Sequence, residues 1–198
     1  MDAMSSPSAG TPGSGALGSG MLLVATPELN DPNFHETVIF LLDSDADGAL
    51  GVVLNRPSPV LVADVLDQWR DIVTGPDVLF QGGPVSTDGA LGLARPLSDA
   101  DRPVGYREVV DGLGVVDLDT PVELLDGGLA AFRIFVGYAG WGPGQLDAEV
   151  EEGSWYVVPA QLSDVFVAEP ADLRRDVLRR QPGEEAWIST RPADPTLN

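Results

Sequence analysis

The sequence predicts a single mixed α/β domain, and three observations lead to that fold class. The 198 residues match the size of one ordinary domain. Hydrophobic residues make up 43% of the chain, which suffices for a buried core despite the high charge. Strand-like and helix-like segments alternate along the chain instead of falling into two blocks, which favours an α/β (α+β) fold. We expect a mixed sheet flanked by helices that is either strongly curled or split into two lobes.

The N-terminus differs in composition from the rest of the chain. Residues 2–20 are almost entirely Ser, Gly, Pro, Ala and Thr, which bury too little apolar surface to offset the entropy lost on ordering. The sequence therefore predicts a disordered tail over residues 1–19 and a folded domain over residues 20–198.

The first part of the domain predicts three strands. Each candidate segment is rich in apolar and β-branched residues, and turn-forming Asn, Asp, Pro and Gly separate the segments. Polar and apolar residues do not alternate in the second and third strands, so we expect both faces of the sheet to be covered. The expected strands are 21–25, 37–42 and 50–54, with a hairpin loop at 43–48.

Helices and further strands alternate in the remainder. Apolar residues recur at helical spacing from Leu61 to Val73, which predicts the first helix. Pro143 is placed to open a later helix at its first position, and Gly153 is placed to close it. The other expected strands are 78–80, 90–94, 106–110, 115–118, 132–138 and 155–158, and the other expected helices are a weak one at 121–129 and those at 159–165 and 172–180.

Acidic residues dominate the charged positions. The chain has 31 Asp and Glu against 11 basic residues, all of them Arg, and its formal net charge is -20. This charge disfavours direct binding to nucleic acid or to an anionic membrane surface, because both need clustered Lys and Arg. The chain has no cysteine, which excludes disulfides and thiolate chemistry. Since no apolar run is long enough for a membrane span and no secretory signal is recognisable, we expect a cytoplasmic protein.

Familiar catalytic and nucleotide-binding patterns are missing. His35 is the one histidine, no G-x-S-x-G elbow accompanies it, and we interpret it as a polar residue at a strand entrance. Asp43, Asp45 and Asp47 resemble half of a calcium loop, but position 12 is Leu54 instead of a bidentate Glu. Without Lys there is no Walker loop. We therefore predict no metal and no cofactor, and keep His35 only as a candidate ligand-binding residue.

Two places remain as candidate binding sites, and the first begins where a buried strand ends. Asn55 and Arg56 follow that strand, and ligands of open α/β sheets collect beyond strand ends. Arg56 can offer a bidentate fork to a carboxylate or phosphate. The alternative is that Arg56 pairs with an internal acid or caps loop carbonyls. Gly82 and Gly83 add a nearby loop that can adopt backbone conformations closed to other residues.

The second candidate is the Gly-rich turn between residues 137 and 146. A strand breaks there into a helix, so free N–H groups and the ring of Trp141 can face a ligand. Gln145 and Glu149 are four residues apart and share one helix face. Close packing of helix on strand is the equally favoured alternative.

Taken together, these pieces resemble the AlgH/YqgE family of bacterial proteins. The resemblance rests on GMLLVATP at 20–27, DPNF at 31–34, GALGVVLNRP at 48–57, GGPV at 82–85, GYAGWGPGQLDAE at 137–149, GSW at 153–155 and the PADPTLN ending. It covers residues 20 to about 198. It implies a compact α/β fold with a curled, barrel-like sheet in the cytosol. It implies little biochemistry, because members are largely uncharacterised, although they are often labelled transcriptional regulators.

The charge distribution conflicts with that label. Residues 1–160 carry 6 Arg and 24 acids, and the remainder carries 5 Arg and 7 acids. The basic cluster consists of Arg174, Arg175, Arg179 and Arg180. Internal ion pairs with Asp172 and Asp176, or an acidic partner surface, suit these side chains better than phosphates do.

These observations support three hypotheses. We favour a non-enzymatic cytoplasmic protein that binds an unknown protein or small-molecule partner in a regulatory role. The alternative is a ligand-binding domain or enzyme whose site joins the Asn55–Arg56, Gly82–Gly83 and Trp141–Glu149 segments. Convergence of those segments on one concave pocket would favour this alternative. Direct DNA binding is the least favoured hypothesis.

Overall fold

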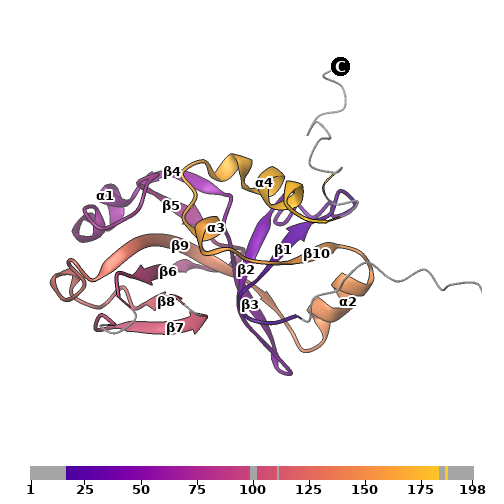
Figure 1. Cartoon of the computed structure of the whole chain (residues 1–198), viewed down its shortest axis with the longest axis horizontal. Coiled ribbons are helices and arrows are strands. Elements are labelled where there is room, and N and C mark those ends of the chain that lie inside the picture. The colour runs from indigo at the N-terminus through magenta and orange to yellow at the C-terminus, as the bar shows by residue number, and fades with distance from the viewer. Residues whose placement is uncertain (1–16, 99–101, 111, 183–185, 187–198) are drawn as a thin grey trace, which may run out of the picture.

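Ten β-strands in the described part of the chain form one continuous sheet that curls back on itself (Figure 1). The computed structural model describes residues 17–98, 102–110, 112–182 and 186, so most of the predicted tail lies outside the described residues. The strand order is β10-β1-β2-β3-β9-β6-β8-β7; β5 pairs with β9, and β4 pairs with β5. Pairing is antiparallel except between β5 and β9. The predicted mixed α/β fold with a curled sheet is confirmed.

The strands vary in length more than the helices do. The strands are β1 (Met21–Ala25), β2 (Val38–Asp45), β3 (Gly48–Val53), β4 (Pro57–Leu61), β5 (Val78–Gln81), β6 (Val85–Pro96), β7 (Tyr106–Val110), β8 (Leu113–Val116), β9 (Leu129–Trp141) and β10 (Trp155–Pro159). The α-helices are α1 (Val62–Val65), α2 (Gln145–Glu151), α3 (Leu162–Val165) and α4 (Leu173–Arg179), and the 3-10 turns are η1 (Asp67–Trp69), η2 (Val122–Leu124) and η3 (Pro170–Asp172). Within the described ranges, no helix has the length and hydropathy that a bilayer crossing requires.

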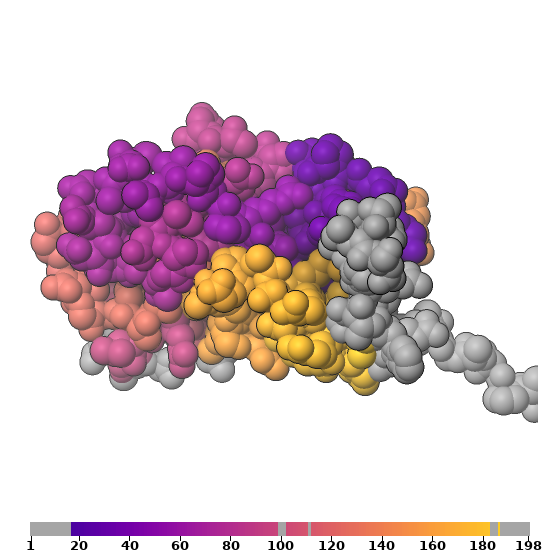
Figure 2. Space-filling view, turned by 90° about the horizontal axis from the view of Figure 1, so that it is seen from above, coloured from indigo at the N-terminus to yellow at the C-terminus, as the bar shows by residue number. Residues whose placement is uncertain are grey.

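The β1–β2–β3 part of the sheet is buried on both faces, as the lack of polar alternation predicted. Phe40 of β2 points into a core cluster that it shares with Val177 of α4. Ile39, the preceding residue, packs on the opposite face with Trp141 of β9 and Leu146 of α2. Seen from above, the yellow C-terminal helices lie beside the purple N-terminal part of the chain (Figure 2).

The curl of the sheet brings the edge strand β7 close to β2, with which it does not pair. Val110 at the end of β7 lies against Gly20, where an added Cβ would be 2.9 Å from Val110 Cγ1. The sheet thus approaches a closed barrel without completing one. An open groove between β7 and the β2–β3 hairpin results.

The segment from Leu61 to Val73 does not form the continuous helix that its spacing predicted. α1 stops at Val65, and Leu66 leaves the helical conformation with φ -130 and ψ 57. The apolar stripe is nevertheless buried, because Trp69 of η1 stacks on Phe132 of β9 with ring centroids 5.0 Å apart. Helical spacing therefore identified the buried face, but two short turns present that face to the core.

Two smaller expectations were also wrong in extent, and one strand was not predicted. The weak helix expected at 121–129 is reduced to the single turn η2. Pro143 precedes α2 instead of opening it, because Gly144 is the N-cap with φ 69. Strand β4 was not predicted because Pro57 and Pro59 cannot donate to a ladder, and β4 pairs only with β5.

The long strand β9 carries a buried arginine. Arg133 is 1% exposed, and its guanidinium donates to the carbonyl oxygens of Val165 at 2.9 Å, Val167 at 2.8 Å and Gly75 at 2.8 Å. It also lies 4.3 Å from the centre of the Phe80 ring. Burial lowers the pKa of Arg133 to about 10, so the side chain stays charged at neutral pH. Arg133 therefore ties β9 both to the end of α3 and to the loop before β5.

Candidate functional site

Asn55 joins the end of β3 to a neighbouring loop, residues 31–37. Its Nδ2 donates to the carbonyl oxygen of Glu36 at 2.9 Å, and its Oδ1 accepts the N–H of Val38 at 2.9 Å. Both polar groups of the side chain are thus used by the backbone on either side of Thr37. Asn55 fixes the conformation with which the loop enters β2.

Arg56 binds the same loop through backbone carbonyls. Its Nη1 donates to the oxygen of Asn33 at 2.6 Å, and its Nη2 donates to those of Pro32 at 3.2 Å and His35 at 3.1 Å. The alternative interpretation, capping of loop carbonyls, therefore describes this side chain. Three of the five guanidinium N–H groups are used, which leaves two.

Arg56 keeps its charge without a paired carboxylate. Partial burial lowers the pKa of Arg56, and the charge of Asp31 opposes that shift. Asp31 forms no ion pair with Arg56 within 4.0 Å. Arg56 is therefore a half-buried cation whose charge the fold does not neutralise directly.

Gly82 and Gly83 allow the chain after β5 to lie directly against β9. Gly82 donates its N–H to the carbonyl of Val136 at 2.7 Å. A Cβ on Gly82 would lie 2.3 Å from the oxygen of Gly137, and one on Gly83 would lie 2.2 Å from the carbonyl carbon of Tyr138. No side chain fits at either position unless the backbone moves.

Arg56 and Gly83 line the same hollow, of about 350 Å³. Its wall consists of Asn33, Arg56, Gln81, Gly83, Pro84 and Thr87, together with two valines of β3 and β9. We call it the Arg56 hollow. It forms where the 31–37 loop, the turn after β3 and the segment from Gln81 to Thr87 meet. Two of the three segments predicted to converge therefore do so.

A bulge in β6 places Thr87 at this hollow. Val85 pairs with Tyr138 and Ala90 pairs with Val136, so residues 86–89 stand opposite Gly137 alone. Within the bulge, Ser86 has φ 49, a left-handed conformation that is unfavourable for a residue with a Cβ.

Glu36, in the loop held by Asn55 and Arg56, has the other positive φ found among the described non-glycine residues, at 57. Such residues cost on the order of 1 kcal/mol or more and cluster at functional sites. Both strained residues belong to segments that form the Arg56 hollow.

The third predicted segment forms a closed network of its own. Trp141 Nε1 and Trp155 Nε1 both donate to Glu149 Oε2 at 2.9 Å, and Gln145 Nε2 donates to Oε1 at 2.9 Å. The ring of Phe34 stacks on Trp141 with centroids 6.1 Å apart. These side chains fasten α2 to the sheet, as in the packing alternative, and they do not line the Arg56 hollow.

His35 stands apart from any catalytic arrangement in the described chain. Its side chain is 53% exposed, and its Nδ1 lies 4.0 Å from the carboxylate of Glu36. No cluster of three or more His, Asp or Glu suited to a metal occurs within the described ranges. The His35 ring therefore has neither a nucleophile to activate nor fellow ligands.

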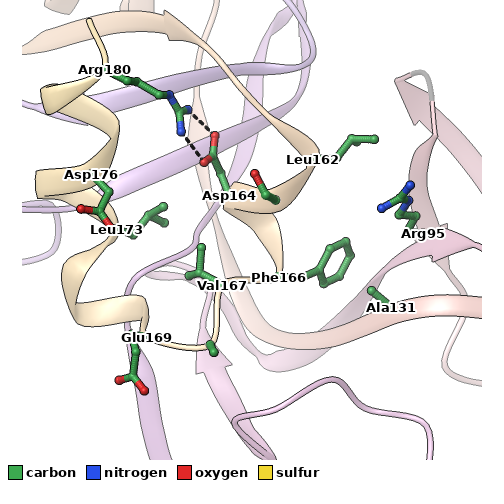
Figure 3. Close-up of a pocket in the computed structure, with 12 residues that line it drawn as sticks. Arg95, Ala131, Leu162, Asp164, Phe166, Val167, Glu169, Leu173, Asp176 and Arg180 are labelled. Carbon is green, nitrogen blue, oxygen red and sulfur yellow. Dashed lines mark hydrogen bonds and ion pairs between the residues drawn. The ribbon is translucent and has the colours of Figure 1, made fainter.

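A second hollow, of about 570 Å³, lies between the α3–α4 segment and strands β6 and β9 (Figure 3). Arg180 binds Asp164 through both guanidinium nitrogens, one of them 2.6 Å from Oδ1. Asp164 is 3% exposed and also accepts the N–H of Gln161 at 2.7 Å. Arg95 stands across the hollow from this pair. The Asp164–Arg180 pair of this hollow thus holds α3 to the end of α4.

A third hollow, of about 810 Å³, is the open groove inside the curl. Its lining includes apolar residues such as Leu91 and Val115, and the charged residues Asp43, Arg107 and Asp117. Because both signs of charge occur in the lining, this groove selects no charge class of ligand.

The C-terminal arginine cluster is engaged within the fold. Arg175 pairs with Asp172 at 2.8 Å and Arg179 pairs with Asp176 at 2.6 Å, so the expected internal ion pairs are confirmed. Arg174 donates to the carbonyl of Ala25 at 2.9 Å, and burial lowers its pKa. With Arg180 on Asp164, none of the four guanidiniums lacks an internal partner.

Sequence reasoning missed three polar residues of the Arg56 hollow, namely Asn33, Gln81 and Thr87. The available signal was the run of turn-forming residues from Gly82 to Gly89, which is too irregular for a plain strand. This run indicates that a strand is interrupted. It does not indicate which residue of the interruption lines the hollow.

Comparison with known sequences gives relatives across nearly the whole chain. The model of the AlgH-like family matches residues 22–186. A UPF0301 protein of Streptomyces coelicolor is 54% identical over 183 residues, covering 91% of this chain and 95% of that protein. A UPF0301 protein of Mycobacterium leprae is 44% identical over 182 residues, covering 91% and 90%.

Solved structures agree in fold. The crystal structure of protein DIP2367 from Corynebacterium diphtheriae has a TM-score of 0.84 at 33% identity, covering 89% of this chain and 94% of that one. The solution structure of the AlgH protein from Pseudomonas aeruginosa has a TM-score of 0.67 at 28% identity, covering 93% and 100%. The chain therefore belongs to the AlgH-like UPF0301 family, whose function is unknown.

Proposed function

We propose that the protein is a non-enzymatic binding protein that recognises a small ligand at the Arg56 hollow. The observation that carries this proposal is the meeting of three separate loops around one half-buried cation that has no paired carboxylate. The volume of about 350 Å³ lies at the lower end of the range of small-molecule sites. The glycines and the two strained residues support a site whose shape is fixed before binding.

The contacts of the motif residues favour binding over chemistry. A nucleophile needs a base within hydrogen-bond range, and the base needs an orienting partner. The chain has one histidine, which is exposed and has its Nδ1 4.0 Å from the carboxylate of Glu36. Glu149, the carboxylate of the most specific motif, is held by two indoles and an amide.

A cytoplasmic, regulatory role accompanies this proposal. The absence of cysteine fits a reducing compartment. A protein that binds its ligand without converting it acts by a change that binding causes, either in its own conformation or in the partner that it binds. The charge of -20 directs this role away from direct contact with DNA.

A ligand screen on the full-length protein tests the proposal. Metabolites in anionic, neutral and cationic groups are scored first by thermal shift, because a ligand that prefers the folded state raises its stability. Amide chemical shifts of the ¹⁵N-labelled protein then locate each hit. We expect shifts at Asn33, Gln81, Gly83 and Thr87, and recovery of the ligand unchanged after overnight incubation.

Two results would overturn the proposal. Hits whose shifts fall in the other two hollows, or no hits at all, would remove the Arg56 hollow as the binding site. Conversion of a bound ligand would show that the protein is an enzyme.

A further inference from the structure

We infer that the ligand of the Arg56 hollow carries an oxyanion, either a carboxylate or a phosphate group, and that Thr87 contacts this group together with Arg56. The inference rests on the proposed function and assigns the chemical class of the ligand and a specificity-determining residue.

Arg56 supplies the charge and the direction of binding. Its three hydrogen bonds to loop carbonyls fix the plane of the guanidinium, and two N–H groups remain. Neutral carbonyls compensate the charge of a guanidinium less well than a carboxylate does. A ligand oxyanion therefore forms charge-assisted bonds at this position, which are roughly twice as strong as neutral ones.

Neutral donors surround that cation. Asn33 and Gln81, which carry side-chain amides, and Thr87, which carries a hydroxyl, belong to the same lining. Within the described ranges, none of these three side-chain groups makes a hydrogen bond. Amide and hydroxyl donors beside one guanidinium form a set that suits the several lone pairs of an oxyanion.

The β6 bulge explains why Thr87 is the selective contact. An uninterrupted β6 would continue its pairing with β9 from Ala90 to Val85, and residue 87 would then lie within the ladder. The structure instead keeps Ser86 in a left-handed conformation and turns residues 86–89 out of register. Bulges beside functional sites redirect single side chains in this way.

The acidic surroundings limit the rate of binding more than its strength. Asp31 acts on Arg56 across the loop, and Asp88 lies within the bulge. Together with the net charge of -20, these carboxylates repel an approaching anion at long range. Salt at 0.1 M screens this repulsion beyond a Debye length of about 10 Å. Contacts inside the hollow are shorter and are screened less.

The test is a titration of full-length ¹⁵N-labelled protein with inorganic phosphate, acetate and neutral acetamide at constant ionic strength set by NaCl. We expect at least one of the two anions to shift the amides of Asn33, Gln81 and Thr87, and acetamide to bind at least tenfold more weakly than that anion. The tighter anion identifies the group, phosphate or carboxylate.

Two variants assign the role of Thr87. Thr87→Val keeps the shape of the side chain but removes the hydroxyl, and we expect it to raise the Kd of the anion about fivefold. Thr120→Val, outside the hollow, should change that Kd less than twofold.

The outcomes separate the two proposals. Acetamide binding as tightly as the tighter of the two anions, an unchanged Kd in Thr87→Val, or failure of both anions where a screened ligand still binds the hollow would each overturn the inference and leave the proposed function intact. If neither the anions nor any screened compound binds at the hollow, the proposed function fails as well.

Discussion

Glu149 satisfies two buried indole N–H groups at once. Trp141 and Trp155 are 6% and 4% exposed, so their indole N–H groups depend on an acceptor within the fold. Both indoles donate to Oε2, and Gln145 donates to Oε1. Glu149 is therefore the residue on which the attachment of α2 to the sheet depends.

Glu149→Ala is expected to lower the free energy of unfolding by about 2–4 kcal/mol, because each buried donor left without an acceptor costs about 1–3 kcal/mol. Urea unfolding followed by tryptophan fluorescence measures this loss. Glu152→Ala, an exposed change just beyond the same helix, should shift stability by less than about 0.5 kcal/mol. Equal stability of the two variants would show that the indoles find other partners.

At the residue scale, the sequence singled out Asn55 and Arg56 but did not predict the acceptors of their hydrogen bonds. Arg56 and Asn55 were expected near a ligand, and most of their hydrogen bonds go to the protein's own loop. The motif places an arginine directly after the buried strand, whereas the identity of its acceptors depends on where the 31–37 loop folds. Nothing local in the sequence specifies that position.

The approach of the Gly82–Gly83 segment to β9 determines the shape of the hollow. Because the backbone of β9 occupies the space where a Cβ would lie, each glycine acts through its missing side chain. A methyl group at either position would push the wall of the hollow outward.

Gly82→Ala is expected to destabilise the fold by about 1–3 kcal/mol, the usual cost of overpacking a tight contact. The reason is the distance of 2.3 Å between the new Cβ and the oxygen of Gly137. Thermal unfolding by circular dichroism gives the change. Gly89→Ala is the matched control, since its Cβ would lie 3.5 Å from the nearest oxygen and should be tolerated. Similar melting temperatures of both variants would contradict the packing argument.

Strands were easier to predict than helices. Apolar runs such as those of β1 and β2 form strands almost where expected. Short, continuous apolar runs are typical of strands that are covered on both faces. The segment from Leu61 to Val73 keeps its apolar face but not its helix. Helical spacing specifies burial, and tertiary packing decides whether one helix or two short turns provide it.

Charge is distributed unevenly over the molecule, and each of the four arginines that gather near the C-terminus has a partner within the fold, three of them a carboxylate. Their partners are Asp164, Asp172, Asp176 and a backbone carbonyl. Three of these four arginines are therefore paired with acids of the described chain, which reduces the charge available for phosphates at α4 and its C-cap.

We expect no measurable binding to double-stranded DNA, even at low salt. Labelled duplexes of random sequence at 50 mM NaCl should show no change in fluorescence anisotropy up to high micromolar protein, because binding at low salt depends on Lys and Arg that neutralise phosphates. Tight binding that weakens with rising salt would contradict this expectation. It would support a transcriptional regulator that binds DNA directly.

Pairing of β1 with β10 has a consequence for synthesis. Met21 stands opposite Pro159, so the outer edge of β1 finds its partner only after most of the chain has left the ribosome. Until then, an apolar strand has one open edge, and edges of this kind invite pairing with other chains. A nascent chain that stalls before β10 is therefore prone to aggregate. Rapid synthesis of the C-terminal quarter protects the protein from aggregation during translation.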